Sequence, residues 1–187
     1  MHHVIRLDKK IAAVALLAVI FAAFAVACGS DSGASGGEAA FPKVVASDRI
    51  YTIDDLKDAG IKAVKKYDVE DLPGAEFAWR TVYNQLDYEA RFYATHEDAV
   101  AQGTSFADSV TGEDAIITGD EIMWEEGSKD RRKCSRASWT PHSGCSYSPR
   151  YLEYVIRGNL ILFCEGNEST DAFDNCENLL TLLADPV

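Results

Sequence analysis

Apolar residues recur with helical spacing in three parts of the chain, and strand-like alternation fills the parts between them. The first two of these parts begin with a Thr-x-x-Asp capping box at Thr52 and Thr95, which satisfies backbone amides in the first helical turn. Gly60 and Gly103 lie inside the first two helices, where a missing side chain permits close packing on a sheet. Helices are predicted over residues 53–67, 96–110 and 171–184.

Alternation of apolar and polar residues predicts pairs of adjacent strands. Gly158-Asn159 separates two such runs, and a Gly-Asn dipeptide supplies the positive φ of a tight two-residue turn. Two shorter runs, 115–118 and 121–124, are separated by a Gly-Asp dipeptide and are expected to pair in the same way. The main strand pairs are expected at 77–83 with 88–93 and at 154–157 with 160–163.

The order of these elements indicates the fold class. The strands come in adjacent pairs with no crossover helix between the two strands of a pair, which disfavours a doubly wound parallel sheet. The sequence therefore predicts an α+β fold, with an antiparallel sheet of hairpins and about three helices packed on one face as a two-layer sandwich. A single domain is expected over residues 41–187.

The start of the chain has the three parts of a secretory signal peptide. A basic head precedes an unbroken apolar run over Ile11–Phe24, and small residues follow up to Cys28. The sequence Ala25-Val26-Ala27-Cys28 resembles the lipobox of bacterial lipoproteins. This resemblance implies that residues 1–27 are removed and that Cys28 carries diacylglycerol and an amino-terminal acyl chain such as palmitate. It also implies an exported protein, lipid-anchored to the extracytoplasmic face of a cell-envelope membrane.

Two other interpretations of the leader remain open. Ala25-Val26-Ala27 also fits ordinary signal peptidase, which would release the protein without lipid. The uncharged stretch from Ile11 to Cys28 is just long enough to span a bilayer if it is left uncleaved. Residues 28–40 contain the lipidation site and a stretch rich in Gly, Ser and Ala, which predicts a flexible tether. Such a tether would hold the folded domain about 20 Å from the membrane.

The charge of the chain limits its partners. The net charge is −12, and it becomes about −14 once the three bases and one acid of the leader are removed. This acidity argues against nucleic acid and against electrostatic docking on anionic lipids, because like charges repel. The expected partners are the membrane, through the lipid anchor, and another protein of the envelope.

The chain has five cysteines, an odd number for an exported protein. Lipidation of Cys28 leaves four thiols, which can pair fully in an oxidising compartment. We expect the disulfides Cys134–Cys145 and Cys164–Cys176, although the other pairings remain open. Zinc binding by the first pair and the histidine between them has suitable ligand types but lacks a C-x-x-C pair, so no metal site is predicted.

The segment from Lys129 to Arg150 concentrates positive charge in an acidic protein. Its simpler interpretation is a loop closed by a Cys134–Cys145 disulfide. The sharper hypothesis is a recognition loop for an anionic partner, because long loops on rigid scaffolds often carry function. The candidate contacts are Arg131, Arg132, Lys133, Arg136, Trp139 and His142, with Arg150 at the end of the segment.

No motif identifies a reaction or a cofactor. Within the predicted domain, residues 41–187, a G-x-S-x-G elbow and a phosphate-binding glycine loop are absent, and the acidic run over 113–126 lacks the spacing of a calcium loop. Five aromatic residues of the first strand pair could form a ligand-binding or sugar-binding face, but strands favour aromatic residues for packing alone, so core is preferred. These residues are Trp79, Tyr83, Tyr88, Phe92 and Tyr93. The prediction is a binding or interaction role without catalysis. The alternative is an extracytoplasmic hydrolase with a site near the Cys134–Arg150 loop.

Overall fold

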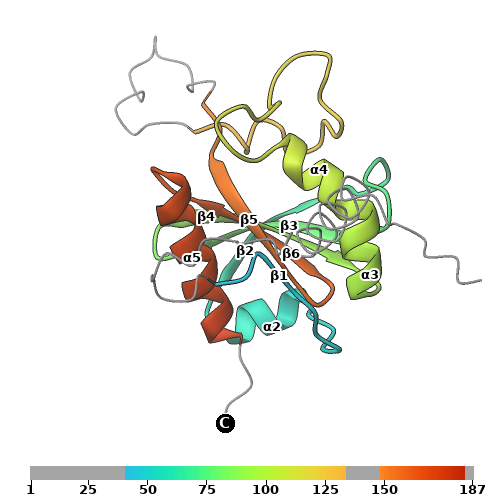
Figure 1. Ribbon diagram of the computed structural model, residues 1–187, viewed down its shortest axis with the longest axis vertical. Helices are drawn as coiled ribbons and strands as arrows, with labels where there is room; N and C mark the ends of the chain where they lie inside the picture. Colours follow the sequence, from blue (N-terminus) through green and yellow to red (C-terminus); the bar gives the residue numbers. More distant parts are fainter. Residues whose placement is uncertain (1–40, 134–147, 184–187) are drawn as a thin grey trace, which may run out of the picture. The chain divides into compact units, whose positions relative to one another are not determined.

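The computed structural model of the protein describes residues 41–133 and 148–183. They form an α+β domain around a six-stranded open sheet with the strand order β1-β5-β6-β4-β3-β2 (Figure 1). Neighbouring strands are antiparallel, except that β1 runs parallel to β5. The elements are β1 (Val44–Val45), α2 (Ile53–Asp58), β2 (Lys62–Tyr67), β3 (Ala75–Tyr83), β4 (Leu86–Tyr93), α3 (His96–Asp98), the π-helical η1 (Ala99–Gly103), α4 (Thr104–Ser109), β5 (Tyr151–Arg157), β6 (Leu160–Glu165) and α5 (Ser169–Leu182).

Helices lie on both faces of the sheet, as the packing along β6 shows. Leu160, Leu162 and Cys164 pack with α2 and α5 in one apolar cluster, whereas Ile161 and Phe163 pack with η1 and α4 in another. Successive side chains of a strand point to opposite faces, so the two clusters lie on opposite sides of the sheet. We call these sides the α5 face and the α4 face.

The coarse prediction of the fold is therefore confirmed, and its finer part is not. The domain is α+β, its sheet is mostly antiparallel, and about three helical segments pack against it. The predicted two-layer sandwich with helices on one face is wrong, because helices cover both faces. The sheet is also more than a series of hairpins, since β4 pairs with β6 and β1 joins as a parallel edge strand.

Two-residue turns connect β3 to β4 and β5 to β6. Asn84 and Gln85 both have positive φ, at 48° and 67°, as a type I′ turn requires. Gly158 begins the other turn with φ of 53°. The close connections keep each of these strand pairs antiparallel and adjacent in the sheet.

The predicted helix over 53–67 is wrong in its second half, which forms the edge strand β2. Gly60 ends the helix with φ of 84°, a conformation that glycine adopts without steric cost. The amide of Ile61 donates to the Leu56 carbonyl at 3.0 Å, and that of Gly60 to the Lys57 carbonyl at 2.9 Å. These two bonds form a Schellman motif, so Gly60 terminates the helix instead of permitting close packing on the sheet.

The second predicted helix is present as α3, η1 and α4 in succession. Thr95 caps its start, because the Thr95 hydroxyl accepts a hydrogen bond from the Asp98 amide at 3.1 Å. Gly103 packs closely on the α4 face as predicted, since a Cβ at this position would lie 2.6 Å from the Tyr93 hydroxyl oxygen. The third predicted helix corresponds to α5.

The short strands predicted at 115–118 and 121–124 do not form. Ile117 and Trp124 are buried, but the backbone around them is irregular. Trp124 packs edge-to-face on Tyr67 of β2, with ring centroids 5.9 Å apart. Ile117 and Trp124 are therefore single apolar residues that hold an irregular segment on the domain. The alternation around them accounts for the wrong prediction of two paired strands.

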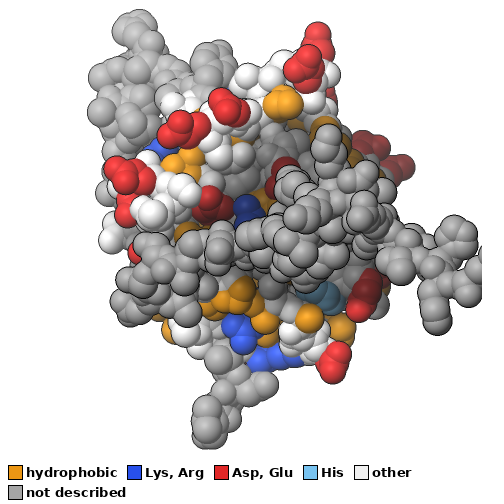
Figure 2. All heavy atoms as spheres, viewed as in Figure 1, with side chains coloured by type: hydrophobic (Ala, Val, Ile, Leu, Met, Phe, Trp, Pro, Cys, Tyr) orange, Lys and Arg blue, Asp and Glu red, His pale blue; other side chains and the backbone are white. Residues whose placement is uncertain are grey.

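The surface of the described domain agrees with its composition. Figure 2 shows acidic side chains scattered over the visible face, as the net charge of −12 leads one to expect. Among the described helices, none is both long and apolar enough to cross a membrane.

Candidate functional site

The predicted contact Arg131 lies inside the domain, in a cluster of charges that we call the buried triad. Its members are Arg131 and, from β4, Glu89 and Arg91, each at most 1% exposed. Arg131 Nε and Nη2 donate to the two carboxylate oxygens of Glu89 at 2.9 and 3.2 Å, and Arg91 Nε donates at 2.7 Å. As a contact for an external partner, Arg131 is wrongly predicted, because its guanidinium is desolvated and paired within the domain.

The triad keeps Glu89 ionised. Burial by itself would raise the pKa of Glu89, but the charges of Arg131 and Arg91 and their hydrogen bonds hold that pKa below its usual range. The Arg91 guanidinium also lies 4.2 Å from the ring centroid of Phe163 and 4.9 Å from that of Trp124. These aromatic faces replace part of the water around the cation. The triad therefore fastens the irregular segment between α4 and β5 to the α4 face.

The other described residues of the predicted binding loop are also engaged by the protein itself. Lys133 donates to the backbone carbonyl of Gly166 at 3.0 Å. Arg150 pairs with Asp87 at 2.5 Å and donates through Nη2 to the carbonyl of Arg132 at 3.1 Å. The predicted contacts Arg136, Trp139 and His142 lie outside the described residues, so their role stays a prediction.

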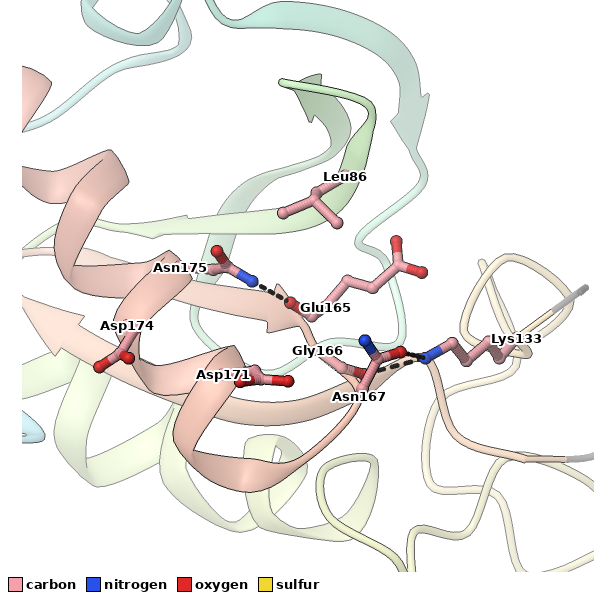
Figure 3. Close-up of a pocket in the computed structure, with 8 residues that line it drawn as sticks. All are labelled: Leu86, Lys133, Glu165, Gly166, Asn167, Asp171, Asp174 and Asn175. Carbon is pink, nitrogen blue, oxygen red and sulfur yellow. Dashed lines mark hydrogen bonds between the residues drawn. The ribbon is translucent and has the colours of Figure 1, made fainter.

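A polar hollow of about 300 Å³ lies beside Lys133 at the start of α5 (Figure 3). Its lining includes the carboxylates of Glu165, Asp171 and Asp174, and Asn175 donates to the backbone carbonyl of Glu165 at 2.9 Å. In the part of the chain that the structure describes, no group of three or more His, Cys, Asp or Glu side chains is arranged to hold a metal ion. The hollow is lined almost entirely by groups that water solvates well, and they indicate no particular ligand.

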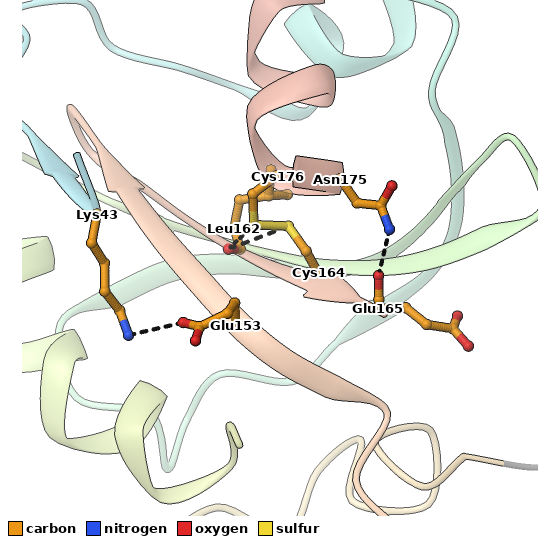
Figure 4. The surroundings of a disulfide bond; sticks show 7 residues. All are labelled: Lys43, Glu153, Leu162, Cys164, Glu165, Asn175 and Cys176. Carbon is orange, nitrogen blue, oxygen red and sulfur yellow. Dashed lines mark hydrogen bonds and ion pairs between the residues drawn. A yellow bond between two sulfur atoms is a disulfide. The ribbon is translucent and has the colours of Figure 1, made fainter. Parts of the chain in front are cut away.

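The predicted disulfide between Cys164 and Cys176 is present (Figure 4). It joins the end of β6 to α5, and both residues are fully buried. A cross-link that closes a loop of this length contributes about 3 kcal/mol in the chain-entropy model. Cys28, Cys134 and Cys145 lie outside the described residues.

A second hollow of about 340 Å³, which we call the aromatic pocket, lies on the α5 face where the chain enters α2. Cavities of this size with a mainly apolar lining are the usual sites for small ligands. Its lining combines aromatic and aliphatic side chains with a few polar ones: Ile50–Asp54, Lys66, Glu76, Phe77, Trp79, Phe92 and Asn159.

The aromatic residues of β3 and β4 divide between the core and this pocket. Tyr88, Phe92 and Tyr93 are buried, in agreement with the preferred interpretation of the sequence. Phe77, however, is 47% exposed, and Trp79 is only partly buried. The spacing of Phe77 and Trp79, two residues apart on one strand, is visible in the sequence and places both side chains on one face of the sheet. The pocket could not be predicted from this spacing alone, because its other wall is the segment before α2.

The wall of the aromatic pocket is fixed by hydrogen bonds. Asn159 Oδ1 accepts from the Tyr51 amide at 2.7 Å, and its Nδ2 donates to the carbonyls of Tyr51 and Tyr93 at 3.1 and 2.9 Å. Thr52 and Asp55 form the predicted capping box at the start of α2. Because these bonds hold the segment before α2 against the sheet, the pocket is built from ordered backbone and not from a free loop.

Four charged side chains lie at or beside the aromatic pocket. Lys66 Nζ lies 4.9 Å from the ring centroid of Phe77, and Lys57 Nζ lies 5.9 Å from that of Trp79. Lys57 also pairs with Asp54 at 2.8 Å. Two ammonium groups and two carboxylates therefore balance one another around the aromatic rings. The four residues are Lys57, Lys66, Asp54 and Glu76.

The described residues thus define an α+β domain that carries an aromatic pocket on one face of its sheet. Residues 52–185 match the profile of the Family of unknown function (DUF6810), and the chain belongs to this family. No curated protein and no solved structure matches the chain.

Proposed function

We propose that the protein is a lipid-anchored extracytoplasmic binding protein whose ligand occupies the aromatic pocket. The observation that carries this proposal is the position of Phe77 and Trp79, which line a hollow of about 340 Å³ while neighbouring aromatic residues enter the core. Contiguous apolar surface on a soluble domain is found mainly where a ligand or a partner covers it.

The pocket offers a ligand both apolar and polar contacts. Trp79 and Phe77 present aromatic surface, and Lys66 and Glu76 present a donor and an acceptor at the rim. The indole Nε1 of Trp79 is buried and has no hydrogen-bond partner among the described residues. Because this nitrogen is buried, a ligand in the pocket would contact the ring of Trp79 and not its N–H group.

The location in this proposal rests on the leader. The lipobox resemblance supports lipidation at Cys28, and the tether that follows would let the domain work near the membrane and contact another envelope protein. The intact mass of the protein extracted from its own membranes tests this part. A chain that starts at Cys28 with added acyl mass supports the anchor, whereas an unlipidated chain contradicts it.

The alternative prediction, a hydrolase with a site near the Cys134–Arg150 loop, gains no support from the described part of that loop. Lys133 and Arg150 are held there by hydrogen bonds to Gly166 and Asp87. We therefore propose the binding function alone.

Ligand-observed NMR with a library of aromatic and polyhydroxylated fragments tests the pocket. We expect a set of fragments that binds the wild-type protein and loses binding in Phe77→Ala. Met123→Ala is a matched control, because Met123 is 46% exposed and does not line the pocket. Equal binding by the two variants, or the absence of any fragment that depends on Phe77, would contradict the proposal.

A further inference from the structure

We infer that the ligand of the aromatic pocket is a neutral oligosaccharide, which continues past Ile50 into a second hollow. This inference rests on the proposed function, because it names the ligand class of the same site. The second hollow has a volume of about 230 Å³ and shares Ile50 with the aromatic pocket. We call it the Ile50 annex.

The aromatic floor suits the flat face of a sugar ring. Phe77 and Trp79 are two residues apart on β3, so their side chains point to the same face of the sheet, about 7 Å apart along the strand. The axial C–H groups of a pyranose carry partial positive charge and pack well on the electron-rich face of an aromatic ring. The two rings are therefore neighbours in the lining of the pocket, and each can contact a sugar ring.

The charges around the pocket favour a ligand without net charge. Lys66 and Lys57 lie over the two aromatic rings, so a cationic ligand would be repelled by two like charges there. An anionic ligand would approach a protein with a net charge of −12, whose surface carboxylates are widespread (Figure 2). The balanced rim can instead donate to and accept from hydroxyl groups, which are the polar groups of a neutral sugar.

The exposure of the pocket argues against an acyl chain. Phe77 is 47% exposed and Ile50 is 54% exposed, so a hydrocarbon chain laid between them would keep much of its surface in water. Burial of methylene groups is the main source of affinity for such a ligand. A sugar loses less binding affinity from this exposure, because its outward-facing hydroxyl groups stay hydrated.

The Ile50 annex has the chemistry to receive further sugar residues. Its lining contains the hydroxyl groups of Ser47 and Thr95 and the carboxylates of Asp48 and Glu97. His96 Nδ1 lies 3.0 Å from the Gly158 carbonyl and ties the start of α3 to the β5–β6 turn. These carboxylates and hydroxyl groups suit hydrogen bonding to a sugar chain that stacking on Phe77 and Trp79 has already positioned.

Calorimetric titration with neutral oligosaccharides tests the inference. The probes are the disaccharide and the hexasaccharide of glucose, of mannose and of N-acetylglucosamine, with hexagalacturonate and laurate as charged and acyl comparisons. We expect at least one neutral hexasaccharide to bind about tenfold more tightly than its disaccharide, because only the longer chain reaches both hollows. Hexagalacturonate and laurate should bind at least tenfold more weakly.

Three variants separate the two hollows. Phe77→Ala should weaken the binding of both chain lengths by about tenfold, since it removes a stacking surface. The double variant Asp48→Ala/Glu97→Ala should weaken binding of the hexasaccharide until its affinity equals that of the disaccharide, and it should leave binding of the disaccharide unchanged. Met123→Ala should change neither.

The outcomes that overturn the inference differ from those that overturn the proposed function. If aromatic fragments bind in a Phe77-dependent way but no neutral oligosaccharide binds, the ligand class is wrong and the binding function stands. If disaccharide and hexasaccharide bind with equal affinity, the annex is not part of the site. If neither fragments nor sugars depend on Phe77, both the inference and the proposed function are overturned.

Discussion

The basic stretch Arg131–Lys133 and the aromatic strand β3 each differ from what their amino-acid composition predicts. The basic stretch has the composition of a surface for an anionic partner, yet Arg131 is 1% exposed and Lys133 donates to a backbone carbonyl. The aromatic strand has the composition of a core element, yet Phe77 and Trp79 line a hollow. Residue type alone does not locate function, because the fold decides which side chains find partners inside the protein.

The position of each strand in the sheet explains the difference. β4 lies inside the sheet between β3 and β6, and both of its faces are covered, so alternation places Glu89 and Arg91 in the interior of the α4 face. A buried carboxylate needs a counter-charge, and Arg131 supplies a second one. β3 lies next to the edge strand β2, where Phe77 stays half exposed. The interior strand β4 therefore pairs with the charge of Arg131 inside the domain. The strand β3, which lies near the sheet edge, leaves apolar side chains in a hollow that a ligand can enter.

The largest effect on stability is expected from removal of the carboxylate of the buried triad. Glu89→Ala leaves two buried guanidinium groups without a counter-charge, and we expect the free energy of unfolding to fall by about 3–5 kcal/mol. Urea denaturation of the purified domain measures this change. The matched control is Asp54→Ala, which breaks the solvent-exposed pair with Lys57 and should cost at most about 1 kcal/mol. Similar losses in the two variants would mean that the triad is not a structural unit.

The disulfide on the opposite face provides the next largest effect. The double variant Cys164→Ala/Cys176→Ala should lower the free energy of unfolding by about 3 kcal/mol, because the unfolded chain regains the entropy that the cross-link removes. Thermal and urea denaturation of the variant and the wild-type protein measure the loss. Binding at the aromatic pocket should persist in the folded fraction, since neither cysteine lines it. An unchanged stability would contradict the role assigned to this cross-link.

Acid denaturation sharpens the account of the triad. The folded-state pKa of Glu89 is held below its usual value, so its contribution is complete above the unfolded-state pKa of about 4.3 and is lost as pH falls through the folded-state value. Denaturation midpoints of the wild-type protein should therefore decline below about pH 4. Glu89→Gln should be less stable at neutral pH and should lose less stability between neutral pH and the acid range. Parallel pH profiles for the two proteins would exclude this linkage.

A smaller change tests the surface part of the basic stretch. Lys133→Ala removes donors to the Gly166 carbonyl and the Asn167 side chain, and we expect a loss of about 1 kcal/mol or less for these partly exposed bonds. The same variant should bind the ligand of the aromatic pocket with unchanged affinity. A large loss of ligand affinity with unchanged stability would restore the basic loop as the binding site.

The parts of the fold that were predictable depend on short-range signals. The capping residues Thr52 and Thr95 and the Gly-Asn turn between β5 and β6 act through their own backbone neighbourhoods, and the structure shows each of them. The β2 strand was hidden because apolar residues over 62–67 continue the helical spacing of α2, and only the left-handed conformation of Gly60 interrupts it. The two-residue strand β1 carries no pattern of its own.

The candidate site was less predictable than the fold because it is assembled from distant segments. The pairing of Glu89 with Arg131 joins residues 42 positions apart, and the turn residue Asn159 holds Tyr51 across 108 positions. The aromatic pocket needs that second link, because it brings Ile50 and the start of α2 over β3. Local composition contains no information about either contact.

The most direct test is to map ligand-induced shifts in the amide NMR spectrum of the wild-type domain, with a bound fragment or a neutral hexasaccharide as the ligand. We predict that the largest shifts fall on Ile50–Asp54 and Phe77–Trp79, with little change at Arg131–Lys133 and Arg150. Shifts concentrated at Arg131–Lys133 and the adjoining loop, with the aromatic pocket unperturbed, would contradict the central claim that the pocket and not the basic stretch binds the ligand.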